Sequence, residues 1–346
     1  MKGVFLTDGI FVPASRFRCE QFFPYFREAG IHPTLRYAYG KSYNRAIHQW
    51  WGNPYKVLGR LRRGVHQVAL PPDTDFVFLQ RTAFPQTALF EKILARRRIP
   101  TFFDFDDSLW VDGTGAVSPS RKKAFQDAVE LADHVIAGNS FLADYAGRPN
   151  KTTIIPTVID TQLYVPSPRR ATDTVVIGWM GTAGNFPFLT RVAPALKTVL
   201  EQRPNVRVRL VSNATFEPLL GIDRVEQIPW SAHEEIAQLQ RFDVGLMPLV
   251  DSPLTRGKCA FKMIQYMAVG APVVVSNVGA NAEVFGDHEL GYILDDFDWV
   301  EALVALVDDA SLRAKMGESG RKRAVASYSI EAVLPTYLDL FEATRR

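Results

Sequence analysis

Short apolar runs alternate with amphipathic stretches along the chain of 346 residues. This alternation is typical of parallel β-sheets covered by helices, so we predict an α/β fold. In the first half the predicted strands are Val4–Leu6, Thr34–Tyr37, Phe76–Leu79, Thr101–Phe105, His134–Ala137 and Thr153–Ile155. The helices predicted between them are Phe17–Glu28, Gln86–Arg97 and Ser120–Leu131. Residues 40–72 depart from the pattern and predict an insertion of helix and loop.

The pattern breaks at residues 165–170, where two prolines and polar neighbours predict a linker. It then restarts with strands predicted at Val175–Met180, Val206–Val211, Val225–Pro229, Val244–Leu249, Pro272–Ser276 and Gly291–Leu294. The helices predicted among them are Phe188–Gln202, Ala232–Gln240, Ala260–Ala268 and Trp299–Val307. The restart predicts two domains of the same class, at residues 1–165 and 166–329, a length comfortable for two cores.

Composition narrows the class of protein. Hydrophobic residues make up 47% and charged residues 22%, which is ordinary for globular proteins. No apolar run approaches the roughly 20 residues that span a bilayer, and Asp8 follows too soon for a signal peptide. The two cysteines and six scattered histidines predict neither a disulfide framework nor a metal site. We therefore expect a cytoplasmic protein.

Charge is divided unevenly between the two halves. Residues 1–165 carry 21 Lys and Arg against 15 Asp and Glu, whereas residues 166–346 carry 19 against 22. The basic excess includes the clusters 56–63 and 92–98. Such clusters fit a membrane surface or an anionic acceptor, and equally a solvated helix face. Nucleic-acid binding is not expected, because the excess is small and no recognition module is present.

Small residues follow the first predicted strand of the second half. Gly181, Thr182, Ala183 and Gly184 form a turn between the strand and the next helix. Small residues let a backbone approach a ligand closely, and a helix N-terminus offers N–H groups to phosphate. A tight turn after any strand looks similar, so phosphate binding and a plain turn both stay open.

A second stretch, residues 256–276, reads as loop, helix, Gly stop and buried strand. Lys258, Lys262 and Gln265 are spaced by four and three, which predicts a shared helix face near its start. Cations there oppose the helix dipole unless an anion binds. Anion binding and a solvated basic face are the two interpretations.

Three carboxylates, Asp104, Asp106 and Asp107, come at the carboxyl end of the strand Thr101–Phe105. Carboxylates this close need a partner to ionise together. Asp104 with Asp106 would suit a divalent metal on a diphosphate. Asp106 or Asp107 would alternatively contact sugar or acceptor hydroxyls, or Asp107 or Ser108 would simply cap a helix.

A further candidate is the start of the first predicted helix. Ser15 is read as its cap, followed by Arg16 and Arg18, an arrangement that suits an anion as well as ordinary surface charge.

Taken together, these stretches resemble retaining glycosyltransferases of the GT-B fold, family four in the usual sequence classification. The resemblance covers about residues 130–345. Residues 137–142 resemble the family's strand-then-Ser stretch, and residues 154–164 resemble its stretch before the linker. Residues 242–249 resemble its strand that ends in proline, and residues 257–276 resemble its glutamate–seven–glutamate helix. Residues 278–283 and 291–294 match its tail. The resemblance implies two Rossmann-like domains facing across a cleft, with residues 330–346 crossing back to the first domain.

The chain departs from the family at three places. Gly257 and Gln265 stand where the family has its two glutamates, and Thr182 and Asn185 stand where it has an Arg and a Lys. An amide still suits a ribose diol. Asp106 and Asp107 take the place of a His-Asp pair.

The resemblance implies a role for each candidate residue. The donor diphosphate is expected to meet Arg256, Lys258, Lys262 and the N–H groups of Gly181–Gly184, with Gln265 on the ribose. Lys258 and Lys262 would stabilise the leaving group, and Asp106 and Asp107 would orient a sugar. Ser15, Arg16, Trp50 and Trp51 are expected to shape the acceptor site.

The expected reaction moves a sugar from a nucleotide-diphosphate sugar to an acceptor hydroxyl with retention. The acceptor would be a sugar, a lipid-linked compound or a natural product. We expect no cofactor and no metal, and contact with a membrane through the basic half. The alternatives are a nucleotide-sugar epimerase, a phosphorylase, a metal-dependent transferase that uses Asp104 and Asp106, or a non-catalytic sugar-nucleotide-binding subunit.

Overall fold

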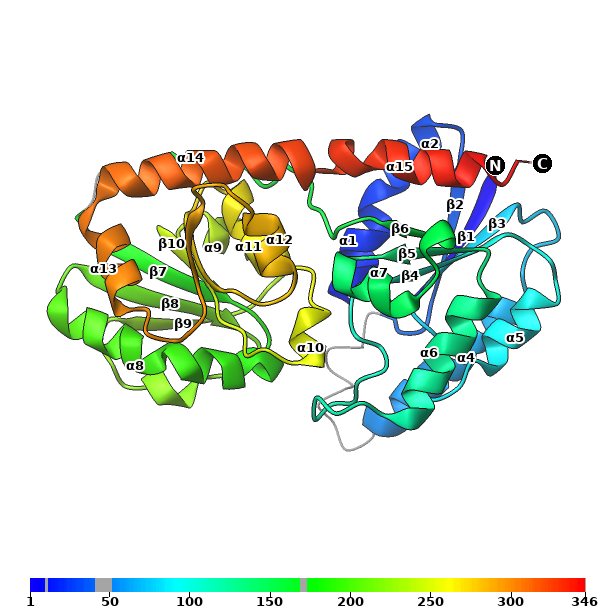
Figure 1. The fold of residues 1–346 in the computed structure, drawn as a ribbon, viewed down its shortest axis with the longest axis horizontal. Helices are drawn as coiled ribbons and strands as arrows, with labels where there is room; N and C mark the ends of the chain where they lie inside the picture. Colours follow the sequence, from blue (N-terminus) through cyan, green and yellow to red (C-terminus); the bar gives the residue numbers. More distant parts are fainter. Residues whose placement is uncertain (10–11, 41–51, 169–172, 346) are drawn as a thin grey trace. The chain divides into compact units, whose positions relative to one another are not determined.

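The computed structural model describes residues 1–9, 12–40, 52–168 and 173–345, and the chain divides into two compact units (Figure 1). Unit 1 comprises Met1–Val158, Ser252–Cys259 and Val333–Arg346, and unit 2 comprises Ile159–Asp251 and Ala260–Ala332. The division therefore falls after Val158 rather than at the proline-rich stretch 165–170. A short segment from the second half of the chain, Ser252–Cys259, belongs to unit 1.

Unit 1 contains a six-stranded sheet in the order β2-β1-β3-β4-β5-β6, and every neighbouring pair is parallel. Its strands are β1 (Lys2–Thr7), β2 (His32–Tyr37), β3 (Phe76–Gln80), β4 (Thr101–Phe105), β5 (His134–Ala137) and β6 (Thr152–Ile154). β3 and β4 are buried along their whole length, which explains their unbroken apolar runs. All six strands lie where the hydrophobic pattern predicts them.

The helices of unit 1 differ from the prediction at two places. They are α1 (Pro13–Arg18), α2 (Phe23–Glu28), α4 (Gly52–Val68), α5 (Leu89–Ala95), α6 (Pro119–Leu131), α7 (Ser140–Ala146) and α10 (Pro253–Arg256), with the short 3-10 turns η1 (Glu20–Phe22) and η2 (Pro149–Lys151). The single helix predicted over Phe17–Glu28 is wrong, because Cys19 has non-helical torsions and Pro24 cannot donate a backbone hydrogen bond. In its described part, residues 52–72, the expected insertion contains the helix α4, which precedes β3.

Unit 2 repeats the architecture with the order β12-β11-β10-β7-β8-β9, again entirely parallel. Its strands are β7 (Val175–Met180), β8 (Val206–Ser212), β9 (Val225–Pro229), β10 (Val244–Met247), β11 (Val273–Ser276) and β12 (Gly291–Leu294). Its helices are α8 (Phe186–Gln202), α9 (Glu235–Leu239), α11 (Phe261–Ala268), α12 (Ala280–Phe285), α13 (Val300–Asp308) and α14 (Ala310–Ser327), with η3 (Ala183–Asn185) and η4 (Glu217–Leu219). The sequence did not predict α14, because its mixed charges leave no clear apolar face.

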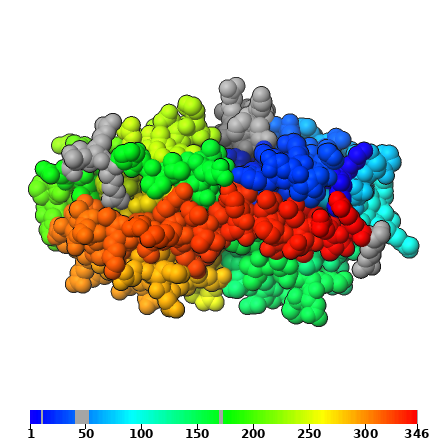
Figure 2. Space-filling model, turned by 90° about the horizontal axis from the view of Figure 1, so that it is seen from above, coloured from blue at the N-terminus to red at the C-terminus, as the bar shows by residue number. Residues whose placement is uncertain are grey.

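The last helix, α15 (Ile330–Glu342), contributes its aromatic side chains to the core of unit 1. Tyr337 packs against Phe22 with ring centroids 4.9 Å apart, and Phe341 stacks on Phe76 at 4.5 Å. Figure 2 shows α15, in red, at the surface beside the blue segment that contains α1 and α2. Buried aromatic contacts of this kind stabilise packing beyond the area that they bury.

Within the described parts of the chain, none of the helices combines the length and the apolar character that a bilayer crossing requires.

Candidate functional site

The glycine turn of unit 2 follows β7 directly. The Gly181 N–H donates to the Val211 carbonyl at 3.0 Å, which holds the turn to the end of β8. The Ala183 N–H donates to the Asn213 side chain at 2.8 Å, while Thr182 and Gly184 are exposed. The long helix α8 starts after the turn, so its N-terminal N–H groups and positive dipole end lie next to these exposed residues. The turn is therefore chemically suited to an anion.

Lys262 lies across this turn. A Cβ atom built on Gly181 would sit 2.8 Å from Cε of Lys262 and 2.7 Å from the Trp179 ring. Only glycine therefore fits between the lysine stem and the indole. The structure brings Lys262 and the glycine turn together, as the anion-binding interpretation requires.

α11 holds Lys262 in place because most of the helix is buried. Met263, Ile264, Tyr266 and Met267 are fully buried. The Tyr266 hydroxyl accepts a hydrogen bond from the Met180 N–H at 3.1 Å, at the end of β7. Burial raises the pKa of the Tyr266 phenol, and the hydrogen bond from Met180 only partly offsets this. The phenol therefore stays neutral while it links α11 to the strand that leads into the turn.

Gln265, one helical turn beyond Lys262, is buried in a network around Glu235. The Gln265 amide donates to the Glu235 carboxylate at 3.4 Å. The same carboxylate accepts from the Trp230 indole N–H at 3.0 Å and from the Tyr164 hydroxyl. Because the carboxylate only accepts, it fixes the Gln265 –NH₂ group and so the orientation of the amide.

Lys258 does not share a helix face with Lys262, so that prediction is wrong. α11 begins only at Phe261, because Ala260 before it has a left-handed conformation with φ of 50°. The Asn139 amide donates to the carbonyls of Arg256 and Lys258, each at 3.1 Å, and so holds this segment in unit 1. The spacing of the lysines predicted that Lys258 belongs to the same helix, but the left-handed backbone of Ala260 prevents α11 from starting before Phe261.

The segment around Lys258 lies against the end of β4. The Ser108 hydroxyl donates to the Pro253 carbonyl at 2.6 Å, and a Cβ on Gly257 would sit 2.2 Å from the same hydroxyl oxygen. Gly257, which stands where the resembled family has a glutamate, is therefore required by close packing in unit 1. A glutamate would not fit there.

Asp106 and Asp107 follow β4 in unit 1 and share one arginine. The Arg81 guanidinium donates to Asp106 at 2.7 and 3.2 Å and to Asp107 at 3.1 Å. Burial lowers the pKa of Arg81, but the charges of Asp106 and Asp107 outweigh it and raise that pKa overall. Burial likewise raises the pKa of Asp106, yet Arg81 and then Arg18 bring it below its ordinary value. Arg81 and Asp106 are therefore both charged at neutral pH.

Asp104 lies apart from this group, in a buried ion pair with Arg18. Neither side chain is exposed, and the Arg18 Nε and Nη2 atoms both donate to the carboxylate, with Nε–Oδ2 at 2.8 Å. The third nitrogen donates to the Ile155 carbonyl at 3.0 Å. No cluster of His, Cys, Asp or Glu within the described ranges has metal-binding geometry. Asp104 and Asp106 are thus each bound to an arginine, Arg18 and Arg81.

The predicted acceptor residues have different outcomes. Ser15 is not the cap of α1, which starts at Pro13 after Val12; its buried hydroxyl instead accepts from the Gly9 N–H at 3.1 Å. Arg16 lies over the neighbouring Phe17 ring at 4.8 Å. Trp50 and Trp51 lie outside the described residues.

Two residues of these clusters were missed from the sequence. Arg81 comes directly after β3, as Asp106 comes directly after β4, so the signal that selected the carboxylates also marks the arginine. Its left-handed backbone, with φ of 64°, carries no sequence signal. Glu235 was predicted only as part of a helix. Its low exposure of 5% in the structure identifies it as a buried carboxylate beside Gln265.

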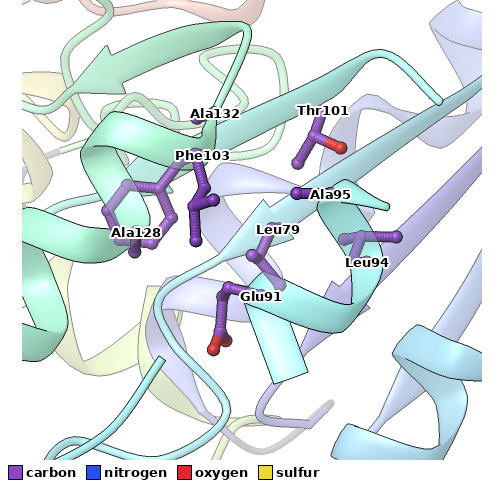
Figure 3. A pocket seen from close by; sticks show the side chains of 9 residues that line it. Leu79, Glu91, Leu94, Ala95, Thr101, Phe103, Ala128 and Ala132 are labelled. Atoms are coloured by element: carbon purple, nitrogen blue, oxygen red, sulfur yellow. The ribbon is translucent and has the colours of Figure 1, made fainter. Parts of the chain in front are cut away.

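Unit 1 also has a small hollow between the helices α5 and α6 and the strands β3 and β4 (Figure 3). Its volume is about 10 Å³, room for no more than one water molecule. Leu79, Leu94, Phe103 and Ala128 line it, and Glu91 extends beside it. None of these is a predicted site residue, so the hollow is a packing defect rather than a ligand site.

Known proteins share the fold described above. Residues 172–309 match the model of the family described as glycosyl transferases group 1. Over 99% of the chain, the fold superposes on a glycosyltransferase from Rickettsia africae at a TM-score of 0.73 and 12% identity, covering 98% of that structure. It matches an Anabaena protein in complex with UDP and glucose at 0.67 and 16%, with 99% and 100% coverage. The chain therefore has the GT-B fold, and residues 172–309 of its second half are similar to the glycosyl transferases group 1 family.

Curated relatives are more distant. A D-inositol 3-phosphate glycosyltransferase from Corynebacterium aurimucosum is 24% identical over 58% of this chain and 54% of its own length. An MMP alpha-(1->4)-mannosyltransferase from Mycolicibacterium hassiacum is 27% identical over 66% of this chain and 57% of its own length. The chain thus aligns with about half the length of the curated relatives that it matches.

Proposed function

We propose that the protein transfers a sugar from a nucleotide-diphosphate sugar to an acceptor hydroxyl, with retention of configuration and without a metal. The observation that carries the proposal is the position of Lys262 across the Gly181 turn, next to the N-terminus of α8. A cation, the exposed turn residues Thr182 and Gly184 and the positive end of a helix dipole lie together there, which suits a pyrophosphate. The same groups would stabilise the charge of the leaving diphosphate.

Two features support the details of this reaction. Structural neighbours were solved with UDP and UDP-glucose, which makes UDP the first donor product to test. Asp104 and Asp106, the carboxylates that a metal would use, are each bound by an arginine. The resemblance to retaining transferases supports retention, in which the departing phosphate oxygen can take the acceptor proton.

The proposed roles of unit 1 are to bind and orient a sugar. Asp106 is the less exposed of the carboxylate pair, at 14% against 37% for Asp107, and both keep oxygens able to accept from hydroxyl groups. Asp106→Asn is expected to keep UDP binding and to lower turnover. Normal turnover in this variant would exclude the role.

The experiment that tests the donor site is calorimetric titration of UDP into the protein and into Lys262→Ala. Because a charge-assisted hydrogen bond is lost, UDP should bind roughly 10- to 100-fold more weakly to the variant. Lys197→Ala on the exposed face of α8 in the same unit is the control and should bind like the parent. Equal affinities for the Lys262→Ala variant and the parent would refute the assignment. Adding magnesium tests the metal-free proposal, since affinity should not change.

A second candidate is a non-catalytic sugar-nucleotide-binding subunit. It is favoured by Gly257 and Gln265, which replace the two glutamates of the resembled family. Product analysis with UDP-glucose and a panel of acceptor sugars separates the two proposals. A new glycoside identifies a transferase, whereas tight binding without any product identifies the subunit, and an altered free sugar nucleotide identifies an epimerase.

A further inference from the structure

The buried side of α4 is polar, which is the reverse of an ordinary surface helix. Arg63 is fully buried; its guanidinium pairs with Asp8 at 2.6 Å and donates to the carbonyls of Gln80 and Arg81 at 2.5 and 2.6 Å. One turn on, the buried Gln67 amide donates to Glu91 at 3.2 Å. α4 is therefore attached to unit 1 through hydrogen bonds and an ion pair.

Two glycines fix this orientation. A Cβ on Gly59 would sit 2.3 Å from the Tyr39 ring, and a Cβ on Gly64 would sit 2.4 Å from the Phe90 ring. Only a side of the helix without side chains at these two positions can approach unit 1 so closely. The helix cannot turn its apolar residues inward without separating these contacts.

The outer face of α4 is apolar. Val57, Leu58, Leu61 and Val65 are exposed to 48%, 65%, 44% and 57%. Their spacing of three and four places them on one face. Four large aliphatic side chains on one exposed helix face form a contiguous apolar stripe, which on a monomeric protein marks an interaction site.

Basic residues flank the stripe. Between Gly52 and Val68 the sequence has Lys56, Arg60 and Arg62 besides the paired Arg63, and it has no Asp or Glu. Arg62 lies over the Tyr37 ring at 5.1 Å, at the edge of the helix. An apolar stripe on a helix whose charged residues are all basic complements a surface that offers acyl chains beneath anionic head groups.

We propose that α4 docks on the surface of an anionic lipid bilayer, with Leu58, Leu61 and Val65 inserted among the lipids and Arg60 and Arg62 at the head groups. This interaction is independent of the proposed donor site in unit 2. It explains the basic excess of the first half of the chain as a contact with membrane lipid.

The test is co-sedimentation of the full chain with vesicles of phosphatidylcholine, alone or mixed with phosphatidylglycerol. The protein should bind the mixed vesicles, and added salt should weaken the binding. Leu58→Gln together with Leu61→Gln should lower the partition coefficient roughly tenfold or more, because two inserted leucines are lost. The control, Leu163→Gln with Leu220→Gln, removes equally exposed leucines of unit 2 (61% and 58%) and should bind like the parent.

A second variant, Arg60→Gln with Arg62→Gln, leaves the apolar stripe intact. It should lower binding by about fivefold for each arginine. Unchanged vesicle binding in both variants would overturn the proposal, as would equal binding to phosphatidylcholine alone. Light scattering tests the alternative that a second copy of the chain covers the stripe. If the parent is a dimer that dissociates in the leucine variant, the stripe is assigned to that second copy. UDP titration should give the same affinity for all variants, so a failed vesicle test does not bear on the donor site.

Discussion

The two units have the same architecture but place opposite chemistry at the carboxyl ends of their strands. In unit 1 three arginines are bound by carboxylates: Arg18 by Asp104, Arg63 by Asp8, and Arg81 by Asp106 and Asp107. In unit 2 the corresponding end of β7 carries a glycine turn and Lys262. One edge thus pairs three arginines with four carboxylates, and the other carries a cation packed beside a glycine turn.

This difference indicates that the charged groups of unit 1 mainly fix side-chain positions, whereas the turn of unit 2 is suited to bind a ligand. Buried ion pairs lose much of their attraction to desolvation, so they hold positions more than they add stability, and they leave little net charge for a ligand. A glycine turn at a helix N-terminus does the reverse, because it adds few contacts and attracts an anion. The comparison therefore supports the proposed division of roles, with anion binding in unit 2 and hydroxyl-binding carboxylates in unit 1.

The largest effect is expected from Asp104→Asn in unit 1. The substitution leaves the Arg18 charge buried without its counter-charge, which should lower the free energy of unfolding by about 3–5 kcal/mol. Urea denaturation followed by circular dichroism measures this. Asp127→Asn is the control, because its partner Lys92 is half exposed and such a pair contributes below about 1 kcal/mol. Equal losses in the two variants would show that the buried pair does not organise unit 1.

The second prediction concerns Asp106→Asn and its dependence on pH. Losing hydrogen bonds to a charged arginine should cost about 1.5–3 kcal/mol at pH 7. Because the folded-state pKa of Asp106 lies below that of the unfolded chain, this stabilisation is complete above about pH 4. It is then lost as the pH falls through the folded-state pKa.

The measurement for Asp106 is urea denaturation of the parent and the variant at a series of pH values. Their difference in unfolding free energy should be constant from neutral pH to about pH 4 and should shrink below it. A difference that persists unchanged into acid would mean that the hydrogen bonds, and not the charge on Asp106, matter.

These charged groups also show what the sequence allows one to predict. Each of the twelve predicted strands is correct within a few residues, and the central ones, such as β3 and β4, are buried on both faces and give uninterrupted apolar runs. The glycine turn and Lys262 could be selected from local spacing alone, and the structure places them side by side. Arg18 and Asp104 lie 86 residues apart, and no local pattern pairs them. Likewise, the left-handed Ala260 that removes Lys258 from α11 is an alanine, the residue most typical of helices.

The third prediction tests the close packing of Lys262 and Trp179 against Gly181. Gly181→Ala places a methyl group against Trp179 and the Lys262 stem, and should cost about 1–3 kcal/mol by overpacking. Because the lysine must move, UDP affinity should fall as well. Gly184→Ala, whose added Cβ would meet nothing closer than 3.8 Å, is the matched control for thermal unfolding and titration. If both variants keep the parent's stability and affinity, Lys262 does not lie over Gly181.

The smallest effect is expected from Glu235→Gln, which probes the carboxylate of unit 2 that is held by neutral donors. Trp230, Tyr164 and Gln265 all donate to it, and an amide offers one acceptor oxygen where the carboxylate offers two. One donor then loses its acceptor, at a cost of about 1 kcal/mol. The freed Gln265 amide can also reverse its orientation, so UDP affinity should fall a few-fold if this amide binds the ribose. Glu234→Gln, at the exposed neighbouring position, should change neither quantity. A drop in stability without a drop in affinity would keep Glu235 as a packing residue and remove Gln265 from the ribose site, whereas Lys262 would keep its role at the turn.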